Sequence, residues 1–105
     1  MELKEFMETS LLLSYYKNLL SNRQKEYMIK HFEEDYSLSE IAKEYNVSRQ
    51  AVYDNIKRGI KILEDYEEKL GIFSRDKKLL KMLREIEKKY KIDEIKEIIE
   101  LLEAQ

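Results

Sequence analysis

The sequence predicts an all-α protein, and three observations lead to this fold class. The 105 residues include no proline and only two glycines, so little in the chain interrupts a helix. The chain is rich in Leu, Ile, Lys and Glu, the mixture that helical proteins favour. Apolar residues recur at spacings of three and four along residues 52–70 and 79–102. We therefore expect a helix-turn-helix bundle followed by a C-terminal helical extension.

Serine and asparagine, rather than proline, mark the expected helix ends. The stretches "SNRQ" (21–24) and "SLSE" (37–40) have the form of a capping box, in which a serine and the third residue after it bond to amides of the first turn. Ser48 is expected to begin a helix, whereas Asn46 and Gly71 tolerate the left-handed backbone that ends one. These signals predict helices near residues 2–20, 22–34, 38–45, 49–70, 74–90 and 94–103.

The distribution of charge predicts two parts of the chain. Residues 64–74 have a net charge of −3, whereas residues 75–91 hold eight basic and three acidic residues, a net charge of +5. This change predicts a boundary between a helix-turn-helix domain at 1–73 and a C-terminal helical extension at 74–105. The extension is expected to be a basic helix followed by an acidic helix, because residues 92–105 have a net charge of −4.

Residues 37–58, "SLSEIAKEYNVSRQAVYDNIKR", have the spacing of a helix-turn-helix. A small alanine stands where two helices must approach closely, an asparagine makes the tight turn, and apolar residues point toward a shared core. The alternative is three ordinary packed helices that place an alanine there by chance. The residues expected to build the motif are Ser37, Glu40, Ile41, Ala42, Asn46, Val47, Val52 and Ile56.

The second helix of this motif is expected to have one buried and one outward side. On a helical wheel the apolar side holds Val52, Ile56, Gly59, Leu63, Tyr66 and Leu70. On the outward side, glutamine can pair with adenine, arginine with guanine and aspartate with the amino group of cytosine, while lysine suits phosphates. The alternative for each of these residues is a solvated helix face. The candidates for base edges are Ser48, Arg49, Gln50, Tyr53 and Asp54, and the candidates for phosphates are Lys57, Arg58 and Lys61.

The net charge of the chain lowers the expectation of tight DNA binding. The chain has 22 acidic and 20 basic residues, a net charge of −2. Residues 47–63 nevertheless hold four basic residues and one acidic residue, a net charge of +3. Phosphates respond to such a local patch, because salt screens charges beyond about 8–10 Å. Double-stranded DNA is therefore the expected partner, bound through a local basic surface.

The stretch "DYSLSEIAKEYNVSRQAVYDNIKRGIKILEDYEEKL" (35–70) resembles the YlxM family of small bacterial proteins, and "SRQAVYDNIKR" is its most specific part. The resemblance covers most of residues 11–73. Members of this family resemble the fourth region of sigma factors, and their genes lie beside that of the signal recognition particle GTPase. The resemblance thus implies a DNA-binding regulator linked to protein targeting. The alternative is an adaptor that binds the signal recognition particle protein or its RNA with the same bundle.

Apolar residues outside the motif predict further packing. The stretch "LLLSYYKNLL" (11–20) is apolar on nearly all sides, which predicts packing on the core, with one side available to a second copy of the chain. The tail is expected to form an antiparallel helix pair, or to pack against a second subunit. Its stripes are Leu79, Leu83, Ile86 and Tyr90, then Ile92, Ile95, Ile99 and Leu102.

The composition disfavours several other classes of function. The chain has no cysteine, its one histidine is His31, and no glycine-rich phosphate loop is present. We therefore expect no enzyme activity, no metal and no cofactor. No apolar run approaches the roughly 20 residues that span a bilayer, and the first ten residues lack the form of a signal peptide. These features predict a cytoplasmic protein without membrane insertion.

Overall fold

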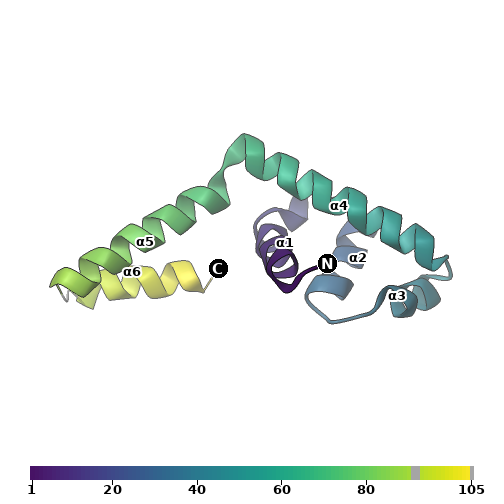
Figure 1. Ribbon diagram of the computed structural model, residues 1–105, viewed down its shortest axis with the longest axis horizontal. Coiled ribbons are helices and arrows are strands. Elements are labelled where there is room, and N and C mark those ends of the chain that lie inside the picture. The colour runs from purple at the N-terminus through teal and green to yellow at the C-terminus, as the bar shows by residue number, and fades with distance from the viewer. Residues whose placement is uncertain (91–92, 105) are drawn as a thin grey trace. The chain divides into compact units, whose positions relative to one another are not determined.

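The computed structural model describes residues 1–90 and 93–104, and these residues form helices without a β-strand among them. The predicted all-α fold is confirmed (Figure 1). The first helix is shorter than expected, because it ends in a 3₁₀ turn, η1 (Lys17–Leu19). The α-helices are α1 (Leu3–Tyr16), α2 (Asn22–Phe32), α3 (Leu38–Tyr45), α4 (Arg49–Leu70), α5 (Ile72–Tyr90) and α6 (Asp93–Glu103).

The chain divides into two compact units, Met1–Leu70 and Gly71–Gln105. The core of the first unit forms where α1, α2 and α3 each pack against the long helix α4. Tyr16 of α1 lies in this core, and its hydroxyl donates to Oε1 of Glu67 on α4 at 2.6 Å, which satisfies the buried polar group. The most deeply buried side chains are Leu13, Tyr16, Met28, Ile41, Val52 and Leu63.

A glycine brings α2 and α4 close together. A Cβ atom on Gly59 would lie 2.9 Å from Sδ of Met28 and 3.2 Å from Cγ of Gln24. Gln24 is buried in this contact, and its Nε2 donates to the backbone oxygen of Asn55 at 3.3 Å. The capping box expected at Ser21 is therefore wrong. Ser21 precedes α2 but makes no side-chain cap bond, and the side-chain amide of Gln24 bonds to α4 rather than to the backbone of Ser21.

The buried side of α4 agrees with the helical wheel up to its last turn. Val52, Ile56, Gly59 and Leu63 are buried. Tyr66 is half-buried and stacks on Tyr16, with the ring centroids 6.0 Å apart. Burial of Leu70 was expected and is wrong, since this side chain is 53% exposed. The side chains of the first unit that cover α4 end near Tyr66, one turn before Leu70.

In the second unit, α5 and α6 lie side by side as an antiparallel hairpin (Figure 1). On α6 the expected stripe faces α5: Ile99 is buried and Ile95 and Leu102 are half-buried, while Ile92 lies outside the described residues. On α5, Leu83 is half-buried in the hairpin, whereas Leu79, Ile86 and Tyr90 of the expected stripe are exposed in the single chain and do not pack against α6. A neighbouring stripe, Leu80, Leu83 and Glu87, is half-buried in their place.

Candidate nucleic-acid interface

The first helix of the motif begins with a complete capping box. The backbone N–H of Glu40 donates to Oγ of Ser37, and the backbone N–H of Ser37 donates to Oε1 of Glu40, both at 3.0 Å. The bond from the Ser37 backbone to the carboxylate holds the pKa of Glu40 below its ordinary value. These bonds satisfy two amides that the helix itself leaves unpaired, and they fix where α3 begins.

The turn between α3 and α4 depends on a left-handed residue. Asn46 has φ 55° and ψ 48°, a conformation that asparagine accepts more readily than most residues. The N–H of Val47 donates to the oxygen of Ala42 at 3.0 Å, and the N–H of Asn46 to that of Lys43 at 3.4 Å, which is the Schellman pattern. Val47 was expected to enter the core, and this expectation is wrong. Its side chain is 37% exposed, because the backbone of Val47 closes the turn and the side chain stays at the edge of the core.

The start of α4 is fixed by a cap and by buried anchors. Oγ of Ser48 accepts from the backbone N–H of Ala51 at 3.0 Å, so this hydroxyl caps the first turn of α4. A serine hydroxyl that accepts can still donate, which leaves Ser48 able to contact a ligand. The side chains that hold α3 and α4 against the core are Ile41, Ala42, Val52 and Ile56, all of them buried.

The polar residues of α4 gather on its outward side, which we call the reading face: Arg49, Gln50, Tyr53, Asp54, Lys57, Arg58 and Lys61. Each is exposed except Asp54, which is half-buried. Within this face, Nε2 of Gln50 donates to Oδ1 of Asp54 at 3.0 Å, and Nζ of Lys57 lies 6.0 Å from the centroid of the Tyr53 ring. Nζ of Lys61 forms an ion pair with Asp65 at 3.7 Å, which reduces the positive charge at that end.

The structure adds a hollow beside the reading face that the sequence did not indicate. It has a volume of about 330 Å³, and its lining includes Tyr53 and Lys57 of α4, Met1, and His31 and Phe32 of α2. Nδ1 of His31 lies 2.8 Å from the backbone oxygen of Tyr36, so the histidine is held in place by the chain. Sequence reasoning missed the hollow because its lining residues lie far apart in the chain.

A basic residue of α3 was also missed. Lys43 is exposed near the turn that joins α3 to α4. In helix-turn-helix complexes the first helix of the motif crosses the DNA backbone, so a lysine there is placed to meet phosphates. The sequence did offer a signal for Lys43, because it is the one basic residue in the helix "LSEIAKEY".

Two kinds of feature are absent from the described residues. In residues 1–90 and 93–104, no group of His, Asp and Glu side chains is arranged to hold a metal ion. In the same part of the chain, no helix combines the length and the apolar character that crossing a membrane requires. What the reading face offers is hydrogen-bonding side chains and positive charge on a helix anchored from behind.

Two helices joined by an asparagine turn, with the second helix anchored behind and polar in front, define a helix-turn-helix protein. The chain belongs to the family described as "Putative helix-turn-helix protein, YlxM / p13 like", which matches residues 3–103. It is 51% identical to a UPF0122 protein of Fusobacterium nucleatum, over 97% of this chain and 99% of that protein. It is 45% identical to the UPF0122 protein YlxM of Bacillus subtilis, over 99% of this chain and 96% of that protein. The family match therefore extends through the α5–α6 hairpin, beyond the residues whose sequence showed the resemblance.

Proposed function

We propose that this protein is a cytoplasmic regulatory protein that binds double-stranded DNA through the reading face of α4. One observation carries the proposal. The turn at Asn46 and the buried Val52 and Ile56 hold α4 firmly, while Arg49 and Gln50 in its first turn point outward. A helix anchored in this way can enter the major groove with its N-terminal residues toward the base edges.

The proposal gives the residues of the reading face different roles. Arg49, Gln50, Tyr53 and Asp54 are assigned to base edges because they lie in the first turns of α4, and Ser48 joins them because it caps that end of the helix. Further along α4, Lys57, Arg58 and Lys61 are assigned to phosphates. Lys43 of α3 adds a further phosphate contact. The basic residues bind any duplex, whereas the residues of the first turns select among sequences.

The alternative function is an adaptor that binds the signal recognition particle protein or its RNA. The acidic net charge of −2 and the carboxylate of Asp54 within the reading face favour the protein partner of this alternative, which has no phosphate backbone. A helical RNA duplex is a poor fit for α4, because its major groove is too narrow and deep for a helix to read. The link to protein targeting rests on the resemblance to the YlxM family and is part of the proposal.

Selection from random pools tests this function. The full-length protein is incubated with random duplex DNA and, separately, with random RNA at about 0.15 M salt. We expect enrichment of a duplex DNA motif, and the logarithm of its affinity should fall linearly with the logarithm of salt concentration. The double variant Arg49→Ala/Gln50→Ala serves as the control that should lose the motif. Enrichment from the RNA pool alone, or from neither pool, would favour the adaptor.

A further inference from the structure

The α5–α6 hairpin carries exposed apolar side chains that gather on one side. Leu79, Met82 and Ile86 of α5 are 43%, 49% and 38% exposed, and Ile98 and Leu101 of α6 are 47% and 69% exposed. At about 100° per residue, each set covers about 60° of the circumference of its helix. Viewed from the N-terminus of each helix, both sets are rotated in the same direction away from the residues that contact the other helix. Because the two helices run in opposite directions, sets of residues rotated in the same direction lie on the same side of the hairpin. We call this continuous surface the hairpin face.

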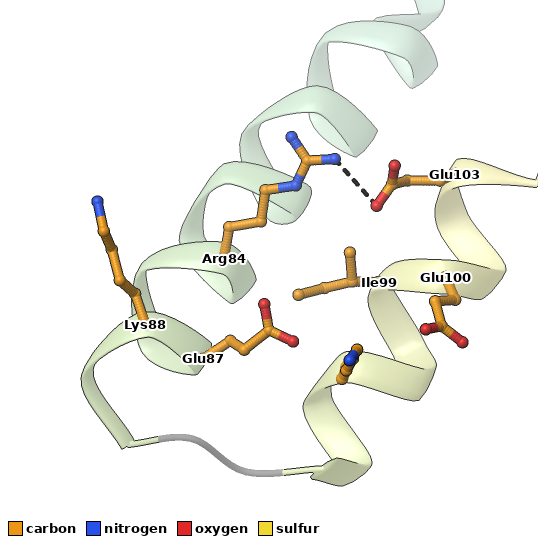
Figure 2. A pocket seen from close by; sticks show the side chains of 7 residues that line it. Arg84, Glu87, Lys88, Ile99, Glu100 and Glu103 are labelled. Carbon is orange, nitrogen blue, oxygen red and sulfur yellow. Dashed lines mark ion pairs between the residues drawn. The ribbon is translucent and has the colours of Figure 1, made fainter.

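The opposite side of the hairpin is polar. Arg84 and Lys88 of α5 and Glu100 and Glu103 of α6 line a pocket on that side, and Figure 2 shows Arg84 and Glu103 turned toward each other in an ion pair. In that pair, Nη2 of Arg84 lies 2.9 Å from Oε1 of Glu103. The hairpin is therefore two-sided, with charged residues on one side and large apolar residues on the other.

The hairpin buries few of its apolar side chains between its own two helices, and several of the large ones remain exposed on the hairpin face. Among residues 71–90 and 93–104, Ile99 is the apolar side chain that is fully buried, and α5 buries none of its own. Helices of this length owe their stability in water mainly to packing of an apolar face. Large apolar patches on a soluble protein commonly mark an interaction surface. The hairpin face thus has the properties of a surface that another molecule covers.

The charges beside the hairpin face indicate which molecule fits. On the α5 side the neighbouring exposed residues include Lys78 and Lys89, and on the α6 side they include Glu94 and Glu97. A twofold axis parallel to the helices sets each α5 against the α6 of a second copy. That arrangement brings Lys89 of one copy near Glu97 of the other, so the face complements itself in charge as well as in apolar character.

The dimensions of the hairpin face suit a dimer. Helices of 19 and 11 residues that lie side by side present a surface of about 20 Å by 16–28 Å, at about 1.5 Å per residue. Side chains make this surface uneven, so its accessible area is larger than the flat outline. That area is on the order of the ~800 Å² that each partner buries in a specific interface. Four helices with antiparallel neighbours are also a common stable bundle.

We propose that two copies of this chain associate through their hairpin faces as a four-helix bundle, with each α5 packed on the α6 of the other copy. The inference stands apart from DNA binding, because it rests on the second unit. If both proposals hold, one particle carries two α4 helices, as proteins that bind paired half-sites do.

Sedimentation equilibrium of the full-length protein provides the first test. We expect the parent to sediment at twice its mass of 12.8 kDa. The variant Met82→Gln/Leu101→Gln should raise the dimer dissociation constant by at least about 100-fold, because four apolar contacts per dimer are lost. The matched control Lys81→Gln/Glu100→Gln places two glutamines on the polar side, also without changing the net charge, and should keep the parental constant. Thermal melts followed by circular dichroism should confirm that both variants remain helical.

A second test addresses the orientation of the two copies. Lys89→Glu and Glu97→Lys should each weaken self-association, because like charges then meet across the interface. An equimolar mixture of the two variants should associate more tightly than either variant by itself, since every cross pair is again of opposite sign. A monomeric parent, equal weakening by both glutamine variants, or a mixture no tighter than its components would overturn the proposal. So would a dimer that dissociates on substitution of Met7 and Leu11 of α1 and not of the hairpin face.

Discussion

Nε2 of Gln50 donates a hydrogen bond to Oδ1 of Asp54, 3.0 Å away, one turn along the exposed side of α4. Reading an adenine with glutamine requires both an amide donor and the amide oxygen. The carboxylate of Asp54 holds one of those donors and also repels phosphates. Asp54 is therefore expected to limit binding to duplexes in general, and Gln50 is held ready in one orientation.

Replacement of Asp54 by alanine should strengthen binding to scrambled duplexes, on which Asp54 makes no specific base contact. Removal of one unit of negative charge from the reading face is worth roughly 1 kcal/mol at solvent-exposed distances, which is about a fivefold gain in affinity. Fluorescence anisotropy titrations of matched and scrambled duplexes measure the effect. Glu85→Ala, which removes the same charge from α5, is the control and should leave the affinity unchanged. Equal gains in the two variants would show that net charge alone acts.

A side chain at position 59 should destabilise the first unit. Gly59→Val places a branched side chain within 2.9 Å of the buried Met28, and overpacking of this kind costs about 1–3 kcal/mol. The control is Arg58→Val, which places a valine at the adjacent exposed position. It loses helix propensity but causes no clash. The free energies of unfolding from urea titrations should still differ between the two variants, by the cost of overpacking less the helix propensity that valine gains over glycine and loses relative to arginine. Equal values would mean that α2 and α4 do not pack closely there.

Valine and glycine at position 46 should have different effects on the stability of the first unit. Asn46→Val forces a β-branched residue to φ 55°, where the left-handed backbone costs an ordinary residue roughly 1–2 kcal/mol. Asn46→Gly meets no such strain and should unfold at nearly the same urea concentration as the parent. Equal destabilisation by both substitutions would indicate that the asparagine side chain, rather than its backbone, holds the turn.

Local signals in the sequence predicted local structure well, and tertiary packing decided the rest. The capping box of Ser37 and Glu40 was visible because both bonds lie within four residues. The same pattern at Ser21 misled, since the buried Gln24 bonds to the backbone of Asn55, 31 positions away. On α5, two overlapping apolar stripes share Leu83, and periodicity alone cannot choose which stripe meets α6. The hollow beside Tyr53 had no sequence signal at all.

The capping box should make stability depend on acid pH. The folded pKa of Glu40 lies below its ordinary value of 4.5, chiefly because the Ser37 backbone donates to the carboxylate. The stabilisation is therefore complete above the unfolded pKa and is lost as the pH falls through the lower folded value. Glu40→Gln removes this titration. The difference in unfolding free energy between parent and variant should be constant at neutral pH and shrink below about pH 4.5. A difference that persists to about pH 3 would contradict this assignment.

The central claim is that the first turns of α4 read base edges while its later turns hold phosphates. The most direct test is a set of titrations with the selected duplex and a scrambled duplex. Arg49→Ala and Gln50→Ala should each cost about 1–3 kcal/mol on the selected duplex and little on the scrambled one. Lys57→Ala should weaken both duplexes alike and lower the salt slope by about one, with a smaller effect for Lys61→Ala because Lys61 also pairs with Asp65. Unchanged affinities in all four variants would contradict DNA binding through this helix.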